Sequence, residues 1–252
     1  MRRRPAPPSV NIATLPTTRH HSRLADAGLG SLLLLSVVVL YCAVRLILAD
    51  ANSFQAERFV SHWRSLGNPP SLEAWTVARG AAERAITLSP VDDSERYHRL
   101  GEILEWRYRD RHPGYTEARD HRLAALDAYR DAARLRPTWP YAWARVASIK
   151  AALLAFDTEF DRAASNALRL GASRSRINLR IARLGLFAWH ELDDTQRDRI
   201  LDAAQRGFAQ NPRQGEKLID YARTIHLDQV VCGALRANSP HHAAGCGIGP
   251  AK

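Results

Sequence analysis

The chain lacks the short motifs that mark several large classes of enzyme. It contains no glycine-rich phosphate loop, no His-Glu-x-x-His element and no Gly-x-Ser-x-Gly turn. These absences argue against phosphate-loop nucleotidases, zinc proteases and α/β-hydrolases. We therefore predict no catalytic residue, no bound metal and no cofactor, and a role other than that of an enzyme.

β-Branched residues are scarce after residue 50, where alanine, leucine and arginine dominate. β-Branched side chains favour strands, whereas alanine, leucine and arginine are good helix formers. We therefore predict an all-α chain. Its 252 residues are enough for one membrane segment and one helical domain of about 200 residues.

Acidic residues are almost missing from residues 1–28, which contain five arginines and one acidic residue, Asp26. The apolar residues of this segment show no helical or strand period. This composition, with its several prolines, predicts a disordered basic tail. The formal net charge of +10 includes that tail, and the chain has no nucleic-acid-binding motif. We therefore predict no nucleic-acid partner.

Charge is also scarce in residues 29–48, an apolar stretch that contains Arg45 as its single charged residue. About 20 apolar residues are needed to cross a bilayer as a helix. Because arginines gather before this stretch, the positive-inside rule predicts a cytoplasmic N-terminus and an exported remainder. We predict one transmembrane helix over residues 29–48.

A cleaved signal peptide is the main alternative for the apolar stretch. Ala49, Asp50 and Ala51 fit the small-x-small pattern of a signal-peptidase site, with cleavage after Ala51. The apolar core is longer than a normal signal core and Arg45 lies close to the cut, so we favour the anchor. A mitochondrial transit peptide fits less well, because the block after the arginines is uniformly apolar.

Cysteine is rare, and two of the three cysteines, Cys232 and Cys246, lie near the C-terminus. In an exported domain this pair predicts a disulfide that closes a 14-residue loop. A metal site is an alternative, because His241 and His242 lie between them, although the Cys-x8-His-His-x3-Cys spacing is unfamiliar for zinc. Two free thiols are the remaining alternative.

One short pattern recurs three times: alanine, three residues, alanine, two residues, leucine. Its copies begin at Ala81, Ala128 and Ala163, so they lie 47 and 35 residues apart. A proline follows each of the first two copies, and a glycine follows the third. Helix endings that recur at such spacing are typical of stacked helix pairs, which mostly bind other molecules.

The part of the chain after the apolar stretch divides at breaks that contain proline and glycine. We predict a stem helix and linker over residues 49–70. A helical domain is predicted over residues 71–230, followed by an irregular tail over residues 231–252 that holds the cysteine pair.

The second copy of the alanine pattern resembles the second helix of a tetratricopeptide repeat. Ala125, Tyr129, Ala132 and Pro137 occupy positions where that repeat carries small, aromatic, small and proline residues. The Trp, Leu-Gly and Tyr of the first helix are not recognisable, and the spacings differ from 34 residues. The resemblance implies a divergent tetratricopeptide-like array.

Residues 135–150, 156–163 and 167–171, together with the C-terminal cysteine pair, carry a wider resemblance. They resemble the VpsP-like proteins of bacterial exopolysaccharide gene clusters, and the likeness extends over about residues 30–246. It implies a single-pass inner-membrane protein with most of its chain in the periplasm. The implied role is accessory, with protein partners in polysaccharide synthesis or export. Direct polysaccharide binding and general periplasmic assembly are the alternatives.

Two groups of side chains are candidate binding surfaces. Trp139, Tyr141 and Trp143 could stack on sugar rings, although aromatic residues in a helical array mostly fill the space between helices. The other group is made of arginines at helical spacing, which could meet acidic sugars, anionic lipid or an acidic protein, or form a solvated face. This group consists of Arg176, Arg180 and Arg183.

Overall fold

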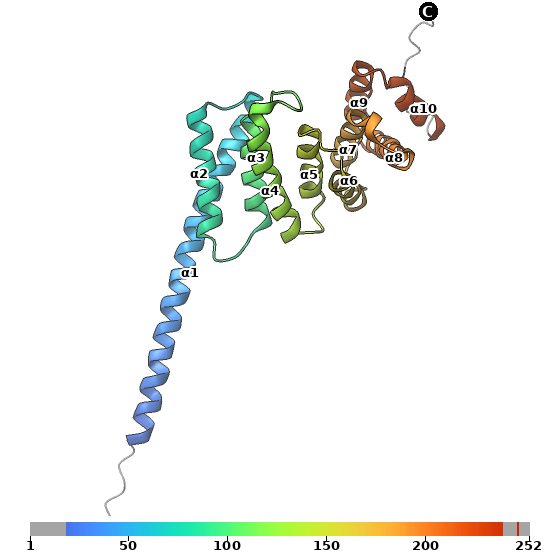
Figure 1. The fold of residues 1–252 in the computed structure, drawn as a ribbon. Coiled ribbons are helices and arrows are strands. Elements are labelled where there is room, and N and C mark those ends of the chain that lie inside the picture. Colours follow the sequence, from blue (N-terminus) through green and yellow to red (C-terminus); the bar gives the residue numbers. More distant parts are fainter. Residues whose placement is uncertain (1–18, 239–245, 247–252) are drawn as a thin grey trace, which may run out of the picture. The chain divides into compact units, whose positions relative to one another are not determined.

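The computed structural model describes residues 19–238 and residue 246, and all regular structure in that part is helical. The prediction of an all-α chain, with an N-terminal helix of membrane-spanning type before a helical array, is confirmed (Figure 1). The α-helices are α1 (Arg19–Leu66), α2 (Leu72–Leu88), α3 (Ser94–Trp106), α4 (Arg119–Leu135), α5 (Pro140–Ala152), α6 (Thr158–Leu170), α7 (Ser175–Phe187), α8 (Asp194–Gln210), α9 (Pro212–Thr224) and α10 (Asp228–Asn238). Two short 3-10 helices, η1 (Thr116–Ala118) and η2 (Trp189–Glu191), precede α4 and α8.

The chain divides into two compact units, Met1–Arg45 and Leu46–Lys252. In the first unit the apolar side chains of α1 are exposed, as at Leu34 (68%) and Leu40 (65%). The mean hydropathy of this part of the helix reaches 2.6. The helix is therefore long and apolar enough to cross a membrane, a property that an N-terminal signal sequence shares.

The stem helix and linker predicted over residues 49–70 correspond to the C-terminal part of α1, which ends at Leu66, and to the non-helical residues that follow it. Ala56, Val60 and Trp63 form a buried stripe of the helix. The Trp63 ring lies 6.0 Å from the Trp106 ring of α3 in an edge-on contact. The apolar stripe of α1 therefore belongs to the core of the domain.

Two predicted domain boundaries differ from those in the structure. Residues 19–28, predicted as disordered, belong to α1, whereas residues 1–18 lie outside the described part. Residues 231–238, predicted as irregular, belong to α10, which packs on α8 and α9. Residues 19–28 include good helix formers, which extend α1 toward the N-terminus. Residues 231–238 are helical because the apolar face of α10 packs against α8 and α9.

Polar side chains cap the starts of several helices. Ser71 accepts a hydrogen bond from the amide of Ala74 at 3.2 Å, and Asp157 accepts hydrogen bonds from two amides of α6. Asp193 forms a reciprocal capping box with Gln196. Each cap satisfies amides that have no partner in the first turn of a helix, so these residues define where the helices begin.

Successive helices of the second unit pair as hairpins, α3 with α4, α5 with α6 and α7 with α8 (Figure 1). Each hairpin packs on the next, since α4 contacts α5, α6 contacts α7 and α8 contacts α9. In addition, α5 contacts α7 and α7 contacts α9. Helices α5, α7 and α9 therefore lie side by side.

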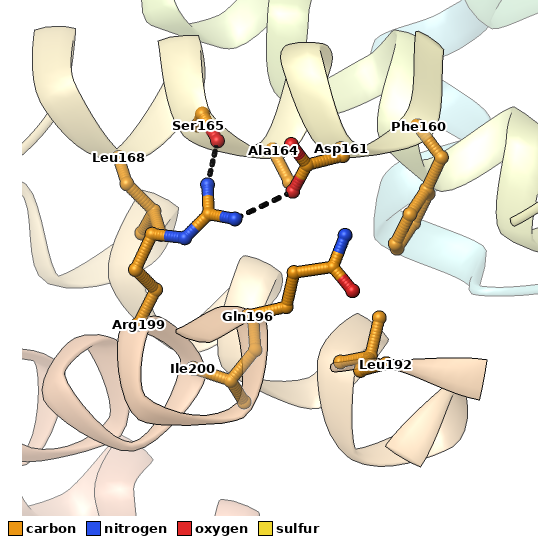
Figure 2. A pocket seen from close by; sticks show the side chains of 9 residues that line it. All are labelled: Phe160, Asp161, Ala164, Ser165, Leu168, Leu192, Gln196, Arg199 and Ile200. Atoms are coloured by element: carbon orange, nitrogen blue, oxygen red, sulfur yellow. Dashed lines mark hydrogen bonds and ion pairs between the residues drawn. The ribbon is translucent and has the colours of Figure 1, made fainter. Parts of the chain in front are cut away.

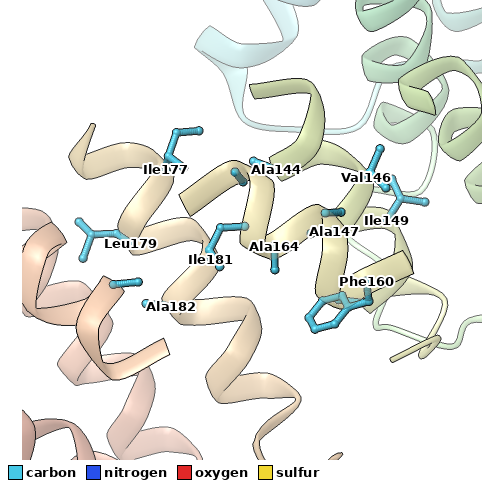
Figure 3. Packing of buried hydrophobic residues seen from close by; sticks show 14 of the residues in the cluster. Ala144, Val146, Ala147, Ile149, Phe160, Ala164, Ile177, Leu179, Ile181 and Ala182 are labelled. Atoms are coloured by element: carbon cyan, nitrogen blue, oxygen red, sulfur yellow. The ribbon is translucent and has the colours of Figure 1, made fainter. Parts of the chain in front are cut away.

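Interlocking aliphatic and aromatic side chains hold the hairpins together. Figure 3 shows Ile149 of α5, Phe160 of α6 and two isoleucines of α7, Ile177 and Ile181, in one cluster. None of the four is more than 3% exposed. Full burial of such a side chain contributes about 1.5–3 kcal/mol, so this cluster is a main source of cohesion between hairpins.

The recurring alanine pattern lies on α2, α4 and α6, of which α4 and α6 are the second helices of their hairpins. All six of its alanines are at most 5% exposed, and their small side chains let neighbouring helices approach closely. Glycine serves the same purpose on first helices. A Cβ added to Gly101 of α3 would lie 2.8 Å from the Tyr129 ring of α4, and one added to Gly185 of α7 would lie 2.3 Å from Ile200 of α8.

The longer first interval of the alanine pattern has a structural cause in the connection between α3 and α4, residues 107–118. Buried Arg122 of α4 donates hydrogen bonds to the carbonyl oxygens of Arg111, His112 and Ala152 at 3.2, 2.9 and 3.0 Å. In addition, α4 has 17 residues whereas α6 has 13. The extra residues lengthen one helix pair, and Arg122 fastens them to the end of α5.

Candidate binding surface

A shallow hollow lies between α6 and α8 (Figure 2). Across it, Arg199 of α8 donates a hydrogen bond to Ser165 and pairs with Asp161 at 2.8 Å. The free space inside is about that of one water molecule. The hollow therefore marks a polar contact between two helices and offers no room for a substrate.

A network of ion pairs, here called the central charge network, connects α1, α3, α4 and α5. Glu102 of α3 is at its centre, with a side chain only 3% exposed. Arg64 of α1 donates to both oxygens of this carboxylate at 2.6 and 2.7 Å, while Arg99 donates at 2.8 Å and Arg145 of α5 at 3.4 Å. The network consists of Glu57, Arg64, Arg99, Glu102, Glu105, Tyr129 and Arg145.

Glu105 is the second acidic centre of the network, one turn further along α3. It accepts a hydrogen bond from the Tyr129 hydroxyl at 2.9 Å and one from Arg145 Nη1 at 3.0 Å. The Arg145 guanidinium also lies 5.9 Å from the centroid of the Tyr129 ring. Arg145 therefore connects α5 to both helices of the preceding hairpin.

The network shifts the ionisation of its members. Burial raises the pKa of Glu102, but the hydrogen bond from Arg64 and the charge of Arg145 outweigh burial and bring the pKa below its ordinary value. Burial lowers the pKa of Arg145, but the neighbouring carboxylates outweigh this and raise it above its ordinary value. Beside them, burial lowers the pKa of His98 to about 4. At neutral pH Glu102 and Arg145 are therefore ionised next to a neutral imidazole.

Three first helices carry polar side chains in the same register. Residues at i, i+4 and i+7 lie on one face of a helix. These residues are His98, Glu102 and Glu105 on α3, Tyr141, Arg145 and Ser148 on α5, and Arg176, Arg180 and Arg183 on α7. The Glu105–Arg145 pair joins α3 to α5, and α5 contacts α7, so the three rows form one polar surface, here called the first-helix face.

The three arginines predicted as a stripe differ in their surroundings. Arg176 is exposed and Arg180 is half-buried. The guanidinium of Arg183 lies 4.5 Å from the centroid of the Tyr221 ring of α9. The stripe is therefore one row of the first-helix face, in which Arg176 and Arg183 are exposed and Arg180 is half-buried.

Arg180 forms no hydrogen bond or ion pair with any residue that the structure describes. Burial lowers its pKa to about 10, and the like charges of Arg145 and Arg109 act in the same direction, whereas Glu105 opposes them. The side chain is still protonated at neutral pH. Arg180 is consequently an uncompensated cation at the edge of a network in which the other charges are paired.

The three aromatic candidates are half-buried, and each has a partner. The Trp139 ring lies 4.7 Å from the His98 ring, and the Trp143 indole donates a 2.8 Å hydrogen bond to a backbone carbonyl. The Arg174 guanidinium lies 5.7 Å from the centroid of the Tyr141 ring. The structure thus brings Tyr141 next to Arg174, the residue before α7, while Trp139 and Trp143 pack between helices.

Cys232 and Cys246 are joined by a disulfide, with their Cα atoms 5.7 Å apart. Both are buried, and Arg236 donates a 3.0 Å hydrogen bond to the carbonyl oxygen of Cys246. His241 and His242 lie outside the described residues. Within residues 28–238 and residue 246, no group of His, Cys, Asp or Glu side chains could hold a metal ion.

Reasoning from the sequence missed the central charge network. Its local signal was the pairing of Arg99 with Glu102 three residues later, on one face of a helix. The other partners of Glu102 come from far along the chain, since Arg64 and Arg145 lie 38 and 43 residues away. No spacing rule connects such distant residues.

No protein-family model matches this chain, and no curated protein matches it either.

Proposed function

We propose that the protein is a non-enzymatic, membrane-anchored accessory or scaffold protein of bacterial exopolysaccharide synthesis or export. Its α1 helix would span the inner membrane with the N-terminus in the cytoplasm, and the helical array would bind a protein partner in the periplasm. The observation that carries this proposal is the first-helix face, a polar surface built by three helices in one register. A surface of this kind suits an extended partner.

Details of the first full hairpin support a tetratricopeptide-like array. Tyr97, Leu100 and Gly101 of α3 have the spacing of the aromatic residue and Leu-Gly pair in the first helix of that repeat. Ala125 and Tyr129 of α4 have the spacing of its second helix. Gly101 packs directly against Tyr129, as a close helix pair requires. Repeats of this class present extended binding surfaces.

The assignment to polysaccharide production rests on the family resemblance of residues 135–150, 156–163 and 167–171. The first of these segments contains Tyr141 and Arg145, which belong to the first-helix face. The resembling part of the chain and the proposed binding surface therefore overlap on α5. This overlap supports a partner from the same machinery.

Affinity purification from cells that make the polymer tests the proposal. The bait is the full-length protein, cross-linked mildly in the membrane before extraction. We expect it to recover a component of the polysaccharide machinery. Failure to recover any such component would contradict the proposed function.

A pair of matched baits tests the surface. Arg176→Glu with Arg183→Glu reverses charge on the first-helix face, whereas Arg162→Glu with Arg169→Glu reverses charge at exposed positions of α6. The first bait should lose the partner and the second should keep it. Equal recovery by both baits would exclude the arginine row of the face as the binding surface.

A further inference from the structure

The first-helix face contains more positive than negative charge around Arg180. Glu105 is already bonded to Arg145, and Glu102 is shared by three arginines. A further cation, Arg109, stands over the Trp106 ring at 4.2 Å and adds to the positive charge that Arg180 experiences. Among the described residues, no carboxylate is left to pair with Arg180.

The like charges of Arg145 and Arg109 repel the half-buried Arg180 guanidinium, which is only partly hydrated and has no counter-ion among the described residues. Packing does not explain the residue, since Ile177 and Ile181 supply the buried side of α7. A charged group kept under such conditions is typical of a binding site. An anion from outside the described structure would therefore complete the surroundings of Arg180.

We propose that Arg180 is the anchor of an anion site, and that its ligand is a carboxylate of an acidic peptide segment in a protein partner. This inference rests on the proposed function and names the chemistry of the partner. The planar guanidinium presents its donors in a fork that matches a carboxylate. Arg176 and Arg183, one turn away on either side, would attract further acidic residues of the same segment.

An acidic peptide fits this site better than an acidic sugar does. Protein sites hold sugar rings on open aromatic faces, with which the ring makes contact. Near Arg180, Tyr129 is fully buried and the Tyr141 ring has Arg174 over it. An extended acidic peptide needs only cations at helical spacing, which α7 supplies.

The direct test uses the full-length protein in detergent micelles and a fluorescein-labelled glutamate decapeptide, with binding read by fluorescence anisotropy. We expect saturable binding that weakens as ionic strength rises. Arg180→Gln should weaken it at least tenfold. The control Arg162→Gln removes the same charge from an exposed position of α6 and should bind within twofold of the unmodified protein. Absence of saturable binding, or equal weakening in both variants, would overturn the site.

Thermal unfolding separates a binding role of Arg180 from a structural one. Because Arg180 has no partner and is repelled by Arg145, Arg180→Gln should leave Tm unchanged or raise it. Arg145→Gln, which loses hydrogen bonds to Glu105, should lower Tm. A fall in Tm for Arg180→Gln as large as that for Arg145→Gln would make Arg180 a structural residue and overturn the proposal.

Competition identifies the source of the anion. Unlabelled glutamate decapeptide should displace the probe at concentrations at which trigalacturonate and inorganic phosphate do not. Displacement by trigalacturonate at equal or lower concentration would overturn the assignment to a peptide.

Affinity purification with the Arg180→Gln bait separates the two proposals. If this bait and the unmodified bait capture a polysaccharide-machinery component equally, the result supports the proposed function and contradicts the anion site. Peptide binding that depends on Arg180, without capture of any such component, would support the site and sink the proposed function.

Discussion

The hydroxyl group of Tyr129 donates a 2.9 Å hydrogen bond to Oε2 of Glu105, although the tyrosine itself is fully buried. The same oxygen accepts a hydrogen bond from Arg145 at 3.0 Å. One carboxylate oxygen thus joins α3, α4 and α5. This carboxylate therefore connects the polar first-helix face to the buried core of the array.

Removal of the Tyr129 hydroxyl should weaken the fold measurably. Tyr129→Phe loses the hydrogen bond to Glu105 and keeps the ring that packs against Gly101. We expect a loss of about 1 kcal/mol in the free energy of unfolding, measured by chemical denaturation. The control Tyr115→Phe, in the connection between α3 and α4, should change stability by less than half of that. Equal effects would show that the buried hydrogen bond contributes nothing specific.

Glu102 should make the stability of the domain depend on acid pH. Its pKa in the folded protein lies below the ordinary value of 4.5, so its contribution is complete above about pH 4.5 and is lost as pH falls through the folded pKa. Glu102→Gln leaves three arginines without a shared carboxylate and should cost about 3 kcal/mol at pH 7.

Unfolding measured at several pH values checks this assignment. The difference between the unmodified protein and Glu102→Gln should shrink as pH falls below about 4.5. Glu83→Gln, at an exposed ion pair with Arg79, is the control and should show little effect at any pH. A difference that stays constant with pH would contradict the role assigned to the Glu102 charge.

The close approach of α3 and α4 predicts opposite effects for two glycine substitutions. In Gly101→Ala the new Cβ would meet the Tyr129 ring at 2.8 Å, so we expect destabilisation of about 1–3 kcal/mol. In Gly80→Ala the nearest atom is the flexible end of Arg84 at 3.2 Å, and the gain in helix propensity should stabilise by up to about 1 kcal/mol. Thermal unfolding of both variants tests the sign, and stabilisation by Gly101→Ala would refute the tight helix contact.

The disulfide should stabilise the end of the array. It closes a loop of 14 residues, so its loss is expected to cost about 3 kcal/mol on the chain-entropy account. Cys232→Ser with Cys246→Ser should lower the free energy of unfolding and make it insensitive to reductant. Cys42→Ser, which leaves the bridge intact, should keep that sensitivity. A protein without the bridge that is as stable as the unmodified one would contradict this prediction.

The parts of the fold that could be predicted from the sequence depend on local chemistry. Alanines four residues apart, each pair followed three residues later by leucine, predicted α2, α4 and α6, because closely packed helices carry small residues at helical spacing. The Leu-Gly pair at Leu100 and Gly101 escaped notice, because the connection 107–118 separates it from Tyr129. The packing of the stem helix into the core could not be predicted, because an apolar stripe such as Val60 and Trp63 has the same spacing whatever it packs against.

The candidate surface was only half predictable for the same reason. The row of Arg176, Arg180 and Arg183 is visible as a helical period in the sequence. The paired state of Arg145 and the unpaired state of Arg180 depend on Glu105, which approaches them only after three hairpins have stacked. The periodicity of the sequence shows which residues share a helix face. Which of their charges are paired depends on contacts between helices that are distant in the sequence.

Site-specific photo-cross-linking in living cells tests the central claim most directly. A benzophenone amino acid replaces Arg176 on the first-helix face, and in a control strain it replaces Arg162 on α6. In cells that make the polymer, we expect an adduct between position 176 and a protein of the polysaccharide machinery, and none from position 162. An absence of adducts from position 176, or the same adducts from both positions, would contradict a scaffold that binds its partner through this face.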